Sequence, residues 1–592
     1  MPTLNWIGKD KVVSLHNDVP FHVLEHGYGF TADGGKTEVE TGSGNKIIHG
    51  DNLTALKSLL PEYEGRVDCI YIDPPYNTGN ENWVYNDNVN DPRIKRWLGE
   101  VVGKEGEDLS RHDKWCCMMY PRLRLLKQLL SEHGVIFISI DDNEYATLHG
   151  LCDEILGESN YIATIVWQKR TSPDARRILS AGHEYILIYT KRLDETFNGI
   201  HKLSWNEESA KNYKNPDNDP RGPWISTDCT AQAGHGTKNQ FYKMITPAGR
   251  VIELPDNLCW RFTKQRMDEE IAAGRIWFGV DGRGVPRKKT YLSESEGHNV
   301  WTWWPNTEVG HTQEATKELT NILEATAKFD YPKPVRLIKR ALEIATNKDS
   351  IILDSFAGSG TTAHAVLDLN KKDGGNRKFI LIEMMDYADT ITAERVKRVM
   401  TGYPYKGEKK EEIYSKKLTP KNITQGDKLL AEAQAKTDEE AKNYTKVSKP
   451  KIQDNCLKVI GTIVTDEKMP GLGGAFDYYE LGPSLFDKDG FLNEDVGEDA
   501  IREYVYYSET RQHLTRQRQE SSKYLLDTFG GTAYYFYYEP HCMTSLDFKS
   551  PLHIAEKADQ YIIYADVCYL PDDYMRKHRI IFKKIPRDIR QF

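Results

Sequence analysis

The sequence predicts an α/β protein whose central sheet is interrupted by an insertion and followed by a further domain. Short apolar runs alternate with stretches of helical periodicity before and after a middle segment that has a different pattern. Alternating strands and helices are typical of a parallel sheet that helices cover on both faces. At 592 residues the chain is also too long for one hydrophobic core, since such cores stop growing at about 250 to 300 residues.

The first half of the sheet is expected between residues 42 and 190, after an irregular N-terminal extension over 1–41. Its strands are predicted over residues 46–50, 67–72, 135–140, 164–168 and 184–189. The helices between them are predicted over 52–60 and 115–133, and Gly134 ends the second helix. A polar, basic stretch from 169 to 182 joins the last two strands.

The insertion is expected over residues 191–315. Pro, Gly and Asn turns replace the alternation there, and seven of the twelve tryptophans fall within it. Alternation resumes over 316–405, which is predicted to hold helices and strands over 335–346, 351–353, 361–369 and 379–382. The sheet is therefore predicted to be interrupted and then completed.

Beyond residue 405 the pattern predicts a linker and a C-terminal domain. Residues 406–451 are charged and poor in apolar side chains, as in a solvated linker, with a helical arm within 428–443. Residues 452–592 combine short strands and helices with many tyrosines, which indicates a separate α+β domain. For these tyrosines a packed sheet core is favoured over a surface for stacking nucleic acid.

The composition excludes several classes of protein. With 39% hydrophobic and 28% charged residues, and no apolar run near the roughly 20 residues of a membrane span, no membrane association is expected. No secretory signal pattern is visible, which favours a cytoplasmic location. Nine cysteines without a Cys-x-x-Cys pair indicate neither disulfides nor a metal site. The net charge of −9 means that any contact with nucleic acid must come from local positive surfaces.

The first motif, Asp73-Pro74-Pro75-Tyr76, directly follows the strand predicted over 67–72. The carboxylate of Asp73 and the carbonyl of Pro74 can accept bonds from the two N–H groups of a base, on a loop that Pro75 stiffens. Tyr76 offers a ring on which an extruded base can stack. A simple turn is the alternative, but residues 77–80 (Asn-Thr-Gly-Asn) extend the pattern. The motif resembles the catalytic motif of the amino-group DNA methyltransferases, which methylate the exocyclic nitrogen of adenine or cytosine.

The second motif lies after the strand predicted over 351–353 and opens the next helix. It contains the residues Asp354, Phe356, Ala357, Gly358, Gly360 and Thr361. Its glycines allow close backbone approach to a ligand, and Ala363 excludes the dinucleotide pattern Gly-x-Gly-x-x-Gly. The turn resembles the S-adenosylmethionine (AdoMet) motif of the same methyltransferases.

Two further carboxylates are candidates for cofactor binding. Glu383 ends the next strand, where it could accept bonds from ribose hydroxyls, and a solvated surface acid is the alternative. Asp51, after the strand over 46–50, could contact the adenine ring of AdoMet. Capping of the following helix explains Asp51 equally well.

The order of catalytic motif, long insertion and AdoMet motif resembles the β class of these enzymes, whose Rossmann-like sheet is circularly permuted. Within that class the sequence is most similar to the Mod subunits of type III restriction-modification systems. Segments that carry this likeness include Asn5–Lys9, Asp141–Glu144, Asp219–Trp224 and Tyr331–Pro334. The resemblance implies that Lys333 and Pro334 open a helix beside the methionine end of AdoMet, and that the insertion recognises the DNA target.

The resemblance also implies a substrate and partners. These are the N6 atom of a flipped adenine in double-stranded DNA, a homodimer and a separate restriction subunit with helicase and nuclease activity. A solitary adenine methyltransferase, a cytosine-N4 methyltransferase and a DNA-recognition subunit of a defence complex are alternatives. Phosphate contacts could come from Lys169, Arg170, Arg176 and Arg177 and from Arg283, Arg287, Lys288 and Lys289. A solvated face is the alternative for either cluster.

Overall fold

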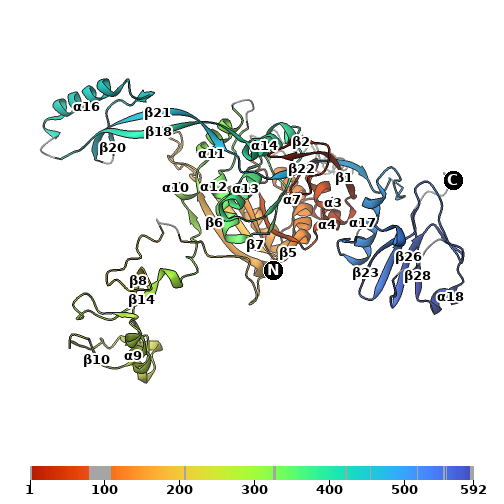
Figure 1. The fold of residues 1–592 in the computed structure, drawn as a ribbon, viewed down its shortest axis with the longest axis horizontal. Helices are drawn as coiled ribbons and strands as arrows, with labels where there is room; N and C mark the ends of the chain where they lie inside the picture. The colour runs from red at the N-terminus through yellow and green to blue at the C-terminus, as the bar shows by residue number, and fades with distance from the viewer. Residues whose placement is uncertain are drawn as a thin grey trace. The chain divides into compact units, whose positions relative to one another are not determined.

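The chain forms two compact units, drawn in Figure 1. The computed structural model describes residues 3–78, 109–205, 209–324, 329–419, 423–453, 455–487, 489–516, 518–550, 554 and 556–586. The first unit contains residues 1–200 and 302–592, and the second contains His201–Trp301. The second unit therefore falls inside the insertion predicted over 191–315.

The first unit is built on a mixed sheet with the strand order β15-β6-β7-β5-β4-β16-β17-β3-β22-β1-β2. The strands are β1 (His22–Thr31), β2 (Gly35–Thr37), β3 (Lys46–His49), β4 (Val67–Ile72), β5 (Leu130–Ile140), β6 (Tyr161–Gln168), β7 (His183–Thr190), β15 (Trp303–Trp304), β16 (Ile351–Asp354), β17 (Lys378–Glu383) and β22 (Ala475–Ser484). The predicted α/β class is confirmed, and so is the return of the chain to the sheet after the insertion.

Six neighbouring strands, from β5 to β22 in this order, are parallel. Their carboxyl ends therefore meet at one edge of the sheet, which we call the carboxyl edge. β7 runs antiparallel to both β5 and β6, so the parallel sheet predicted for the alternating segments is wrong at this end. The connection from 169 to 182 contains no helix, whereas the crossover that joins two parallel strands is usually helical.

The helices that cover this sheet have apolar faces at helical spacing. They include α1 (Lys9–Val12), α2 (Leu15–Asp18), α3 (Asn52–Ser58), α4 (Leu60–Tyr63), α7 (Leu109–Leu129), α8 (Tyr145–Cys152), α10 (Asn306–Val309), α11 (Thr312–Ile322), α12 (Val335–Ala345), α13 (Thr361–Asp373) and α14 (Glu394–Thr401). In α7, Trp115, Met119, Leu123 and Leu126 are fully buried in the main core. No helix of the described ranges has both the length and the apolar content that a membrane span needs.

Two predicted boundaries in this unit are wrong. The helix predicted over 115–133 ends at Leu129, and Gly134 lies inside β5. A Cβ on Gly134 would lie 2.8 Å from the carbonyl oxygen of Val67, so close strand pairing rather than helix termination explains this glycine. The extension over 1–41 is not irregular, because β1 and β2 form a hairpin at the edge of the sheet.

The segment expected to be a linker is part of a long antiparallel pair. β18 (Gly402–Lys417) pairs with β21 (Cys456–Pro470), and the two strands run side by side in Figure 1. α16 (Gly426–Glu440) overlaps the helix predicted within 428–443 and packs Leu429 and Ala433 on the pair. The boundary predicted at residue 452 falls inside this structure, and β22, beyond it, belongs to the main sheet between β3 and β1.

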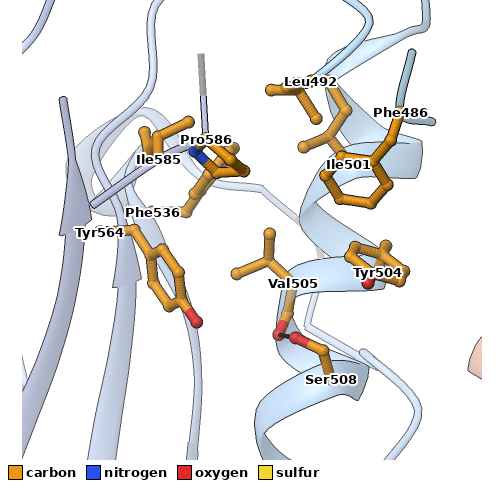
Figure 2. Close-up of a pocket in the computed structure, with 10 residues that line it drawn as sticks. All are labelled: Phe486, Leu492, Ile501, Tyr504, Val505, Ser508, Phe536, Tyr564, Ile585 and Pro586. Atoms are coloured by element: carbon orange, nitrogen blue, oxygen red, sulfur yellow. Dashed lines mark hydrogen bonds between the residues drawn. The ribbon is translucent and has the colours of Figure 1, made fainter. Parts of the chain in front are cut away.

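After β22 the chain forms a smaller sheet with the order β23-β24-β26-β28. Its strands are β23 (Leu525–Phe529), β24 (Thr532–Phe536), β26 (Gln560–Ala565) and β28 (Ile580–Lys584), and α17 (Glu498–Thr510) packs on it. Tyr535 and Tyr538 are almost completely buried, which confirms the interpretation of this segment as a packed core. A cavity of about 190 Å³ lies between α17 and the sheet. Figure 2 shows the side chains that line it, which are mainly apolar and include Val505, Phe536 and Tyr564.

The second unit has a small core of its own. A sheet of β13 (Ile276–Trp277), β14 (Arg287–Tyr291) and β8 (Trp224–Asp228) packs with α9 (Lys264–Ala272) around Trp260 and Met267. Its remaining strands are β9 (Thr230–Gln232), β10 (Met244–Ile245), β11 (Val251–Ile252) and β12 (Leu258–Trp260). The buried Lys289 ammonium bonds the carboxylates of Asp217 and Asp219, which ties β14 to the loop that precedes β8.

Candidate active site

The strand order brings the two motifs of the sequence together at the carboxyl edge. Asp73 follows β4 and Asp354 ends β16, and these strands are hydrogen-bonded neighbours in parallel register. Glu383 ends β17, next to β16 on its other side, and Asp51 follows β3. All four carboxylates named from the sequence therefore lie on successive strand ends.

Asp73 belongs to a buried network of two carboxylates and two ammonium groups. Lys333 Nζ donates to Asp73 Oδ2 over 2.6 Å and lies 3.8 Å from Glu184 Oε2. Lys169 Nζ donates to Glu184 Oε1 over 2.7 Å. The second oxygen of Asp73, Oδ1, is buried and has no hydrogen-bond partner among the residues that the structure describes. An acceptor in that state is costly to bury, and it stays available for a ligand donor.

The pKa values in this network follow from burial and from the paired charges. Burial raises the pKa of Asp73 above its ordinary value, and the Lys333 ammonium offsets part of that rise. Burial alone would also raise the pKa of Glu184, but the charges of Lys333 and Lys169 hold it below the ordinary value. Burial alone would lower the pKa of Lys333, yet the two carboxylates raise it, so this lysine stays charged.

The rest of the first motif is fixed from both sides. Tyr76 OH donates to Glu184 Oε2 over 3.1 Å, and the Lys333 ammonium lies 5.0 Å from the centroid of the Tyr76 ring. Trp115 Nε1 donates to the carbonyl of Pro75 over 2.7 Å. Thus the motif forms a held loop with a defined ring orientation, and the alternative of a plain surface turn does not describe it.

Asn77 extends the motif into a second buried contact. It adopts a left-handed backbone conformation with φ of 58° and its side chain donates to the buried Glu144, which also bonds His112 Nδ1 at 2.7 Å. Asn is one of the few residues that tolerate this conformation. Gly79 and Asn80, the last two residues of the predicted pattern, lie outside the described residues.

The Gly-rich turn between β16 and α13 is held by hydrogen bonds to Asp354. Asp354 Oδ1 accepts from the backbone N–H of Phe356 over 3.0 Å, and Oδ2 accepts from Thr362 Oγ1 over 2.5 Å. Gly358 and Gly360 have φ of 51° and 74°, and a Cβ on Gly360 would lie 3.0 Å from the carbonyl oxygen of Thr392. Both glycines are therefore required by the backbone itself.

Glu383 is held by backbone donors from that turn and from its own loop. Its Oε2 accepts from the N–H of Gly358 over 2.7 Å and its Oε1 from the N–H of Met385 over 3.0 Å. Burial raises the pKa of Glu383 to about 7 despite these bonds. Burial likewise raises the pKa of Asp354 to about 7. Glu383 is 2% exposed, so the alternative of a solvated surface acid is wrong.

An aromatic corner that sequence reasoning missed lies beside Gly358. The rings of Phe329 and Tyr387 meet edge to face with centroids 5.5 Å apart. A Cβ added to Gly358 would lie 3.1 Å from Phe329 Cζ, so this glycine makes room for the ring. Phe329 precedes the Tyr331–Pro334 segment by only two residues, which was the available signal.

Asp51 caps α3, as one of the two interpretations predicted. Its Oδ1 accepts from the N–H of Thr54 over 3.0 Å, and Arg122 Nη2 lies 3.3 Å from Oδ2. Arg122 also bonds the side chain of Asn52, whose Nδ2 donates to the carbonyl of Ser355 over 3.0 Å. This chain of contacts links the end of β3 to the Gly-rich turn.

Lys333 and Pro334 lie where a helix begins, because Pro334 is the N-cap of α12. The side chain of Lys333 points away from this helix start and donates to Asp73, so it also belongs to the site formed by the first motif. Glu184 had no sequence signal beyond being a charged residue at the start of β7, directly before the apolar run. Such a residue in a buried strand is expected only where a cation pairs with it.

The basic side chains named as phosphate contacts are in different situations. Lys169 is used in the buried network, while Arg176 is exposed and bonds Asp174. Arg287 pairs with Asp228, and Lys288 lies 3.6 Å from Glu270.

Within the same two clusters, Lys289 is an interior residue, so its inclusion among surface cations is wrong. The backbone of Arg170 continues the pairing of the β6–β7 loop, through a bond from its N–H to the carbonyl of Gly182. The side chains of Arg177 and Arg283 are exposed.

A family model described as DNA methylase matches residues 67–394, more than half of the chain. The StyLTI Mod subunit, a type III restriction-modification protein of Salmonella typhimurium, is 37% identical over 60% of this chain and 57% of its own length. The EcoPI Mod subunit of Escherichia phage P1 is 34% identical over 64% and 63%. The chain thus spans about three-fifths of the length of these Mod subunits.

A type II methyltransferase, M.KpnI of Klebsiella pneumoniae, is 32% identical over 57% of this chain and 80% of its own length. Among solved structures, a DNA modification methylase of Thermus thermophilus in complex with AdoMet is 15% identical and covers 60% of this chain and 95% of its own. The PvuII DNA methyltransferase is 11% identical over 59% and 86%. Their TM-scores of 0.30 and 0.31 are too low to support an inference. The family match and the M.KpnI relative establish that the chain belongs to the DNA methylase family.

Proposed function

We propose that the protein is a site-specific DNA methyltransferase that transfers a methyl group from AdoMet to N6 of an adenine flipped out of duplex DNA. The observation that carries this proposal is Asp73 Oδ1, which is buried just after β4, the strand that pairs with β16 before the Gly-rich turn. Within the described part of the chain this acceptor has no donor, and it lies where the amino group of a base would have to bind.

The proposed mechanism uses Asp73 and the Pro74 carbonyl as acceptors for the two amino N–H groups. This pairing favours a pyramidal nitrogen, whose lone pair is otherwise delocalised into the ring. Because Lys333 bonds Oδ2, a base can bind Oδ1 without displacing the lysine. Each charge-assisted bond contributes about 1.5 to 3 kcal/mol.

Tyr76 would stack on the flipped base, and Glu184 would hold the ring in place through its bond to the hydroxyl. Stacking contributes about 1 to 3 kcal/mol, against a flipping cost of a few kcal/mol. The two magnitudes are comparable, so the ring helps to keep the base outside the helix.

The residues at the second and third strand ends fit AdoMet. Beside the turn, Ser355 Oγ is buried and has no partner in the described ranges. The Phe329 and Tyr387 rings offer an apolar surface, and Glu383 offers a carboxylate. We infer that Asp354, Phe356, Ala357, Gly358, Gly360 and Thr361 hold the cofactor together with Glu383, Lys333 and Pro334. Bound AdoMet supplies the methyl group on a sulfonium.

An adenine target is favoured over cytosine because the first motif begins with aspartate, where cytosine-N4 enzymes more often have serine. Sequencing DNA by a long-read method, from a methylation-free host that expresses the chain, tests both the base and the site. We expect N6-methyladenine at one short, fixed and asymmetric sequence, and none with Asp73→Ala. N4-methylcytosine, or no modification from a folded wild-type protein, would contradict the proposal.

We further propose that the chain is the modification subunit of a type III-like system, since three of its relatives at 30% identity or more are named as Mod subunits. The insertion would recognise the target, which a chimera with another enzyme's insertion tests through a changed target sequence. A double-stranded DNA substrate agrees with the cytoplasmic location expected from the sequence. A solitary methyltransferase would use the same active site.

A homodimer and a helicase-nuclease partner belong to the same proposal. The sequence has no Gly-x-x-x-x-Gly-Lys-[Ser/Thr] motif, so ATP-driven movement on DNA would need another subunit. We assign assembly or docking to the part of the chain after β22. Light scattering of a chain that ends after Ser484 tests this, because an unchanged dimer would place the interface elsewhere. The cut must follow β22, since this strand lies inside the main sheet.

A further inference from the structure

The loop that joins β6 to β7, residues 169–182, leaves and re-enters the sheet beside the candidate active site. At its start Lys169 donates to Glu184 Oε1, and the other oxygen of Glu184 accepts from Tyr76 OH. The backbone N–H of Lys169 donates to the carbonyl of Gly182 over 2.9 Å, which closes the base of the loop. The tip of the loop is therefore tied by a short chain of contacts to the ring proposed to stack on the base.

Two adjacent aliphatic side chains at the tip are almost completely exposed. The exposed fraction is 103% for Ile178 and 89% for Leu179. Single apolar residues on a surface are ordinary. Two adjacent ones on an otherwise polar loop expose a joint apolar area whose burial in a contact is favourable, so they mark a contact site.

The loop presents these side chains on a defined turn. Asp174 accepts from the backbone N–H and the guanidinium of Arg176, and its own N–H donates to Ser180 Oγ over 2.8 Å. The N–H of Arg177 donates to the carbonyl of Asp174 over 3.0 Å. These bonds hold the segment from 174 to 180 in a turn whose outer side carries Ile178 and Leu179.

The charge of the loop indicates what would cover this tip. Residues 169–182 carry four cationic side chains and one carboxylate, a net charge of +3, in a chain whose net charge is −9. Arg176 and Arg177 immediately precede the aliphatic pair and are exposed. A polyanion with an apolar interior matches this combination, and the stacked bases of duplex DNA between two phosphate chains have that character.

We propose that the tip of the β6–β7 loop is a wedge that inserts Ile178 and Leu179 into the base stack of duplex DNA, beside the position vacated by the flipped adenine. Arg176 and Arg177 contact the flanking phosphates. The two side chains fill the gap that the base leaves in the duplex, which prevents the base from returning. Tyr76 holds the same base at the active site, so the two contacts act together. This inference rests on the proposed function, because it needs a duplex substrate from which a base is extruded.

The test compares the double variant Ile178→Ala, Leu179→Ala with wild type on two DNA substrates that carry the target sequence. In one the target adenine is paired, and in the other it lies opposite an abasic site. A wedge matters only while pairing and stacking must be broken. We expect kcat/KM of the variant to fall at least about tenfold on the paired duplex and to stay close to wild type on the abasic duplex. The fluorescence rise of 2-aminopurine at the target position should fall in parallel on the paired duplex.

Two matched controls isolate the wedge. Ile178→Leu, Leu179→Ile keeps the apolar volume and should behave as wild type. Leu430→Ala, Ile452→Ala removes two other exposed aliphatic side chains, in the segment of α16 and β20 (Lys451–Gln453), and should change neither substrate. Arg176→Gln, Arg177→Gln should weaken binding to both duplexes and reduce the slope of log affinity against log salt by about two.

Several outcomes would overturn the wedge. Undiminished activity of the alanine pair on paired DNA would remove the need for it, and an equal loss on both substrates would indicate a structural role for the loop. Normal methylation combined with loss of a protein partner would assign the tip to that partner. Failure of wild type to methylate either duplex would instead refute the proposed function, and the wedge with it.

Discussion

The carboxyl edge of the sheet holds two pairs of buried carboxylates that are neutralised in different ways. Asp73 and Glu184 lie among the ammonium groups of Lys333 and Lys169. Asp354 and Glu383 have backbone N–H groups and a threonine hydroxyl as partners and no cation in the bonds described for them. Burial raises the pKa of both Asp354 and Glu383 to about 7. On the other side burial also raises the pKa of Asp73, although the Lys333 ammonium offsets part of that rise, and the two cations hold the pKa of Glu184 below its ordinary value.

This comparison indicates a division of labour. On the proposed catalytic side, the ammonium groups of Lys333 and Lys169 favour the charged form of the two carboxylates, which is the form that would accept amino N–H groups. On the proposed cofactor side, Asp354 and Glu383 can change their protonation near pH 7, so their strength as acceptors would depend on the pH and on a bound ligand. Substitutions on each side test this division of roles, and the size of their effects on activity and on AdoMet affinity measures it.

The largest effect is expected on the catalytic side. Asp73→Ala should lower kcat by at least about 10³-fold, because it removes the amino acceptor and leaves Lys333 without its main partner. Methyl transfer measured with labelled AdoMet tests this. Asp142→Ala, which removes an exposed carboxylate near the end of β5, is the control and should stay close to wild type. Wild-type turnover by folded Asp73→Ala would refute the assignment.

Removal of the stacking ring should cost less. Tyr76→Ala is expected to lower kcat/KM about 10- to 100-fold, as the loss of about 1 to 3 kcal/mol of stacking implies. Tyr76→Phe keeps the ring but loses the bond to Glu184, so its kcat/KM should lie between those of wild type and Tyr76→Ala. If alanine and phenylalanine behave alike in steady-state kinetics, the hydroxyl matters and the stacking does not.

Lys333→Met tests whether the ammonium keeps Asp73 ionised. Burial already raises the pKa of Asp73, and removing the cation that offsets this should raise it further. The carboxylate form of Asp73 is the proposed acceptor. As the pH falls, the variant should therefore lose activity at a higher pH than wild type does. The acid limb of kcat/KM is expected to move up by about one unit or more. An unmoved limb, together with reduced activity, would assign Lys333 to the cofactor alone.

On the cofactor side, AdoMet affinity should depend on pH near neutrality. With a pKa of about 7, Glu383 becomes protonated as the pH falls through that value and loses acceptor strength. Affinity should therefore weaken below pH 7. Glu383→Gln should weaken the affinity about 5- to 10-fold at pH 8, which corresponds to roughly one hydrogen bond. It should also reduce the pH dependence, of which Asp354, with a pKa of about 7 as well, retains a part. Calorimetry at pH 6 and pH 8 measures this. If the AdoMet affinities of wild type and Glu383→Gln change equally between the two pH values, the assignment of Glu383 is wrong.

The smallest effect separates the two roles considered for Asp51. Asp51→Ala should lower the free energy of unfolding by about 1 kcal/mol through loss of the α3 cap. Denaturant titration measures this loss, and Asp51→Asn, which retains capping ability, should recover most of it. If Asp51→Ala also weakens AdoMet binding several-fold, the residue contacts the cofactor as well.

The sequence was most informative where a strand ends in a short motif. The strands before Asp73 and Asp354 were predicted within one residue of their observed bounds, because buried parallel strands are continuous apolar runs. Glu383 was identified by the same logic. Lys333 was identified through resemblance, but its bond to Asp73 depends on the order of strands and helices in space.

What the sequence did not indicate were contacts without a local pattern. Glu184 stands at the start of an apolar strand, and Lys169 was assigned to a basic surface. The pairing of antiparallel β6 and β7 that brings them together is not visible in either segment alone. The segment around 402–417 has the composition of a linker, yet β21 supplies its backbone partners from more than thirty residues downstream. Composition describes solvation, whereas pairing across the sheet decides the structure.

The position of β22 affects how the protein is made. β1 ends at Thr31, but its inner neighbour β22 begins only at Ala475. At a synthesis rate of about 5 to 20 residues per second, roughly 20 to 90 s pass between them. During that time the nascent chain carries unpaired edges on β1 and β3, which are open to wrong pairing. The cell must therefore keep a long ribosome-bound intermediate from aggregating, and slower translation or a lack of chaperones should reduce the yield of active enzyme before it changes the specific activity.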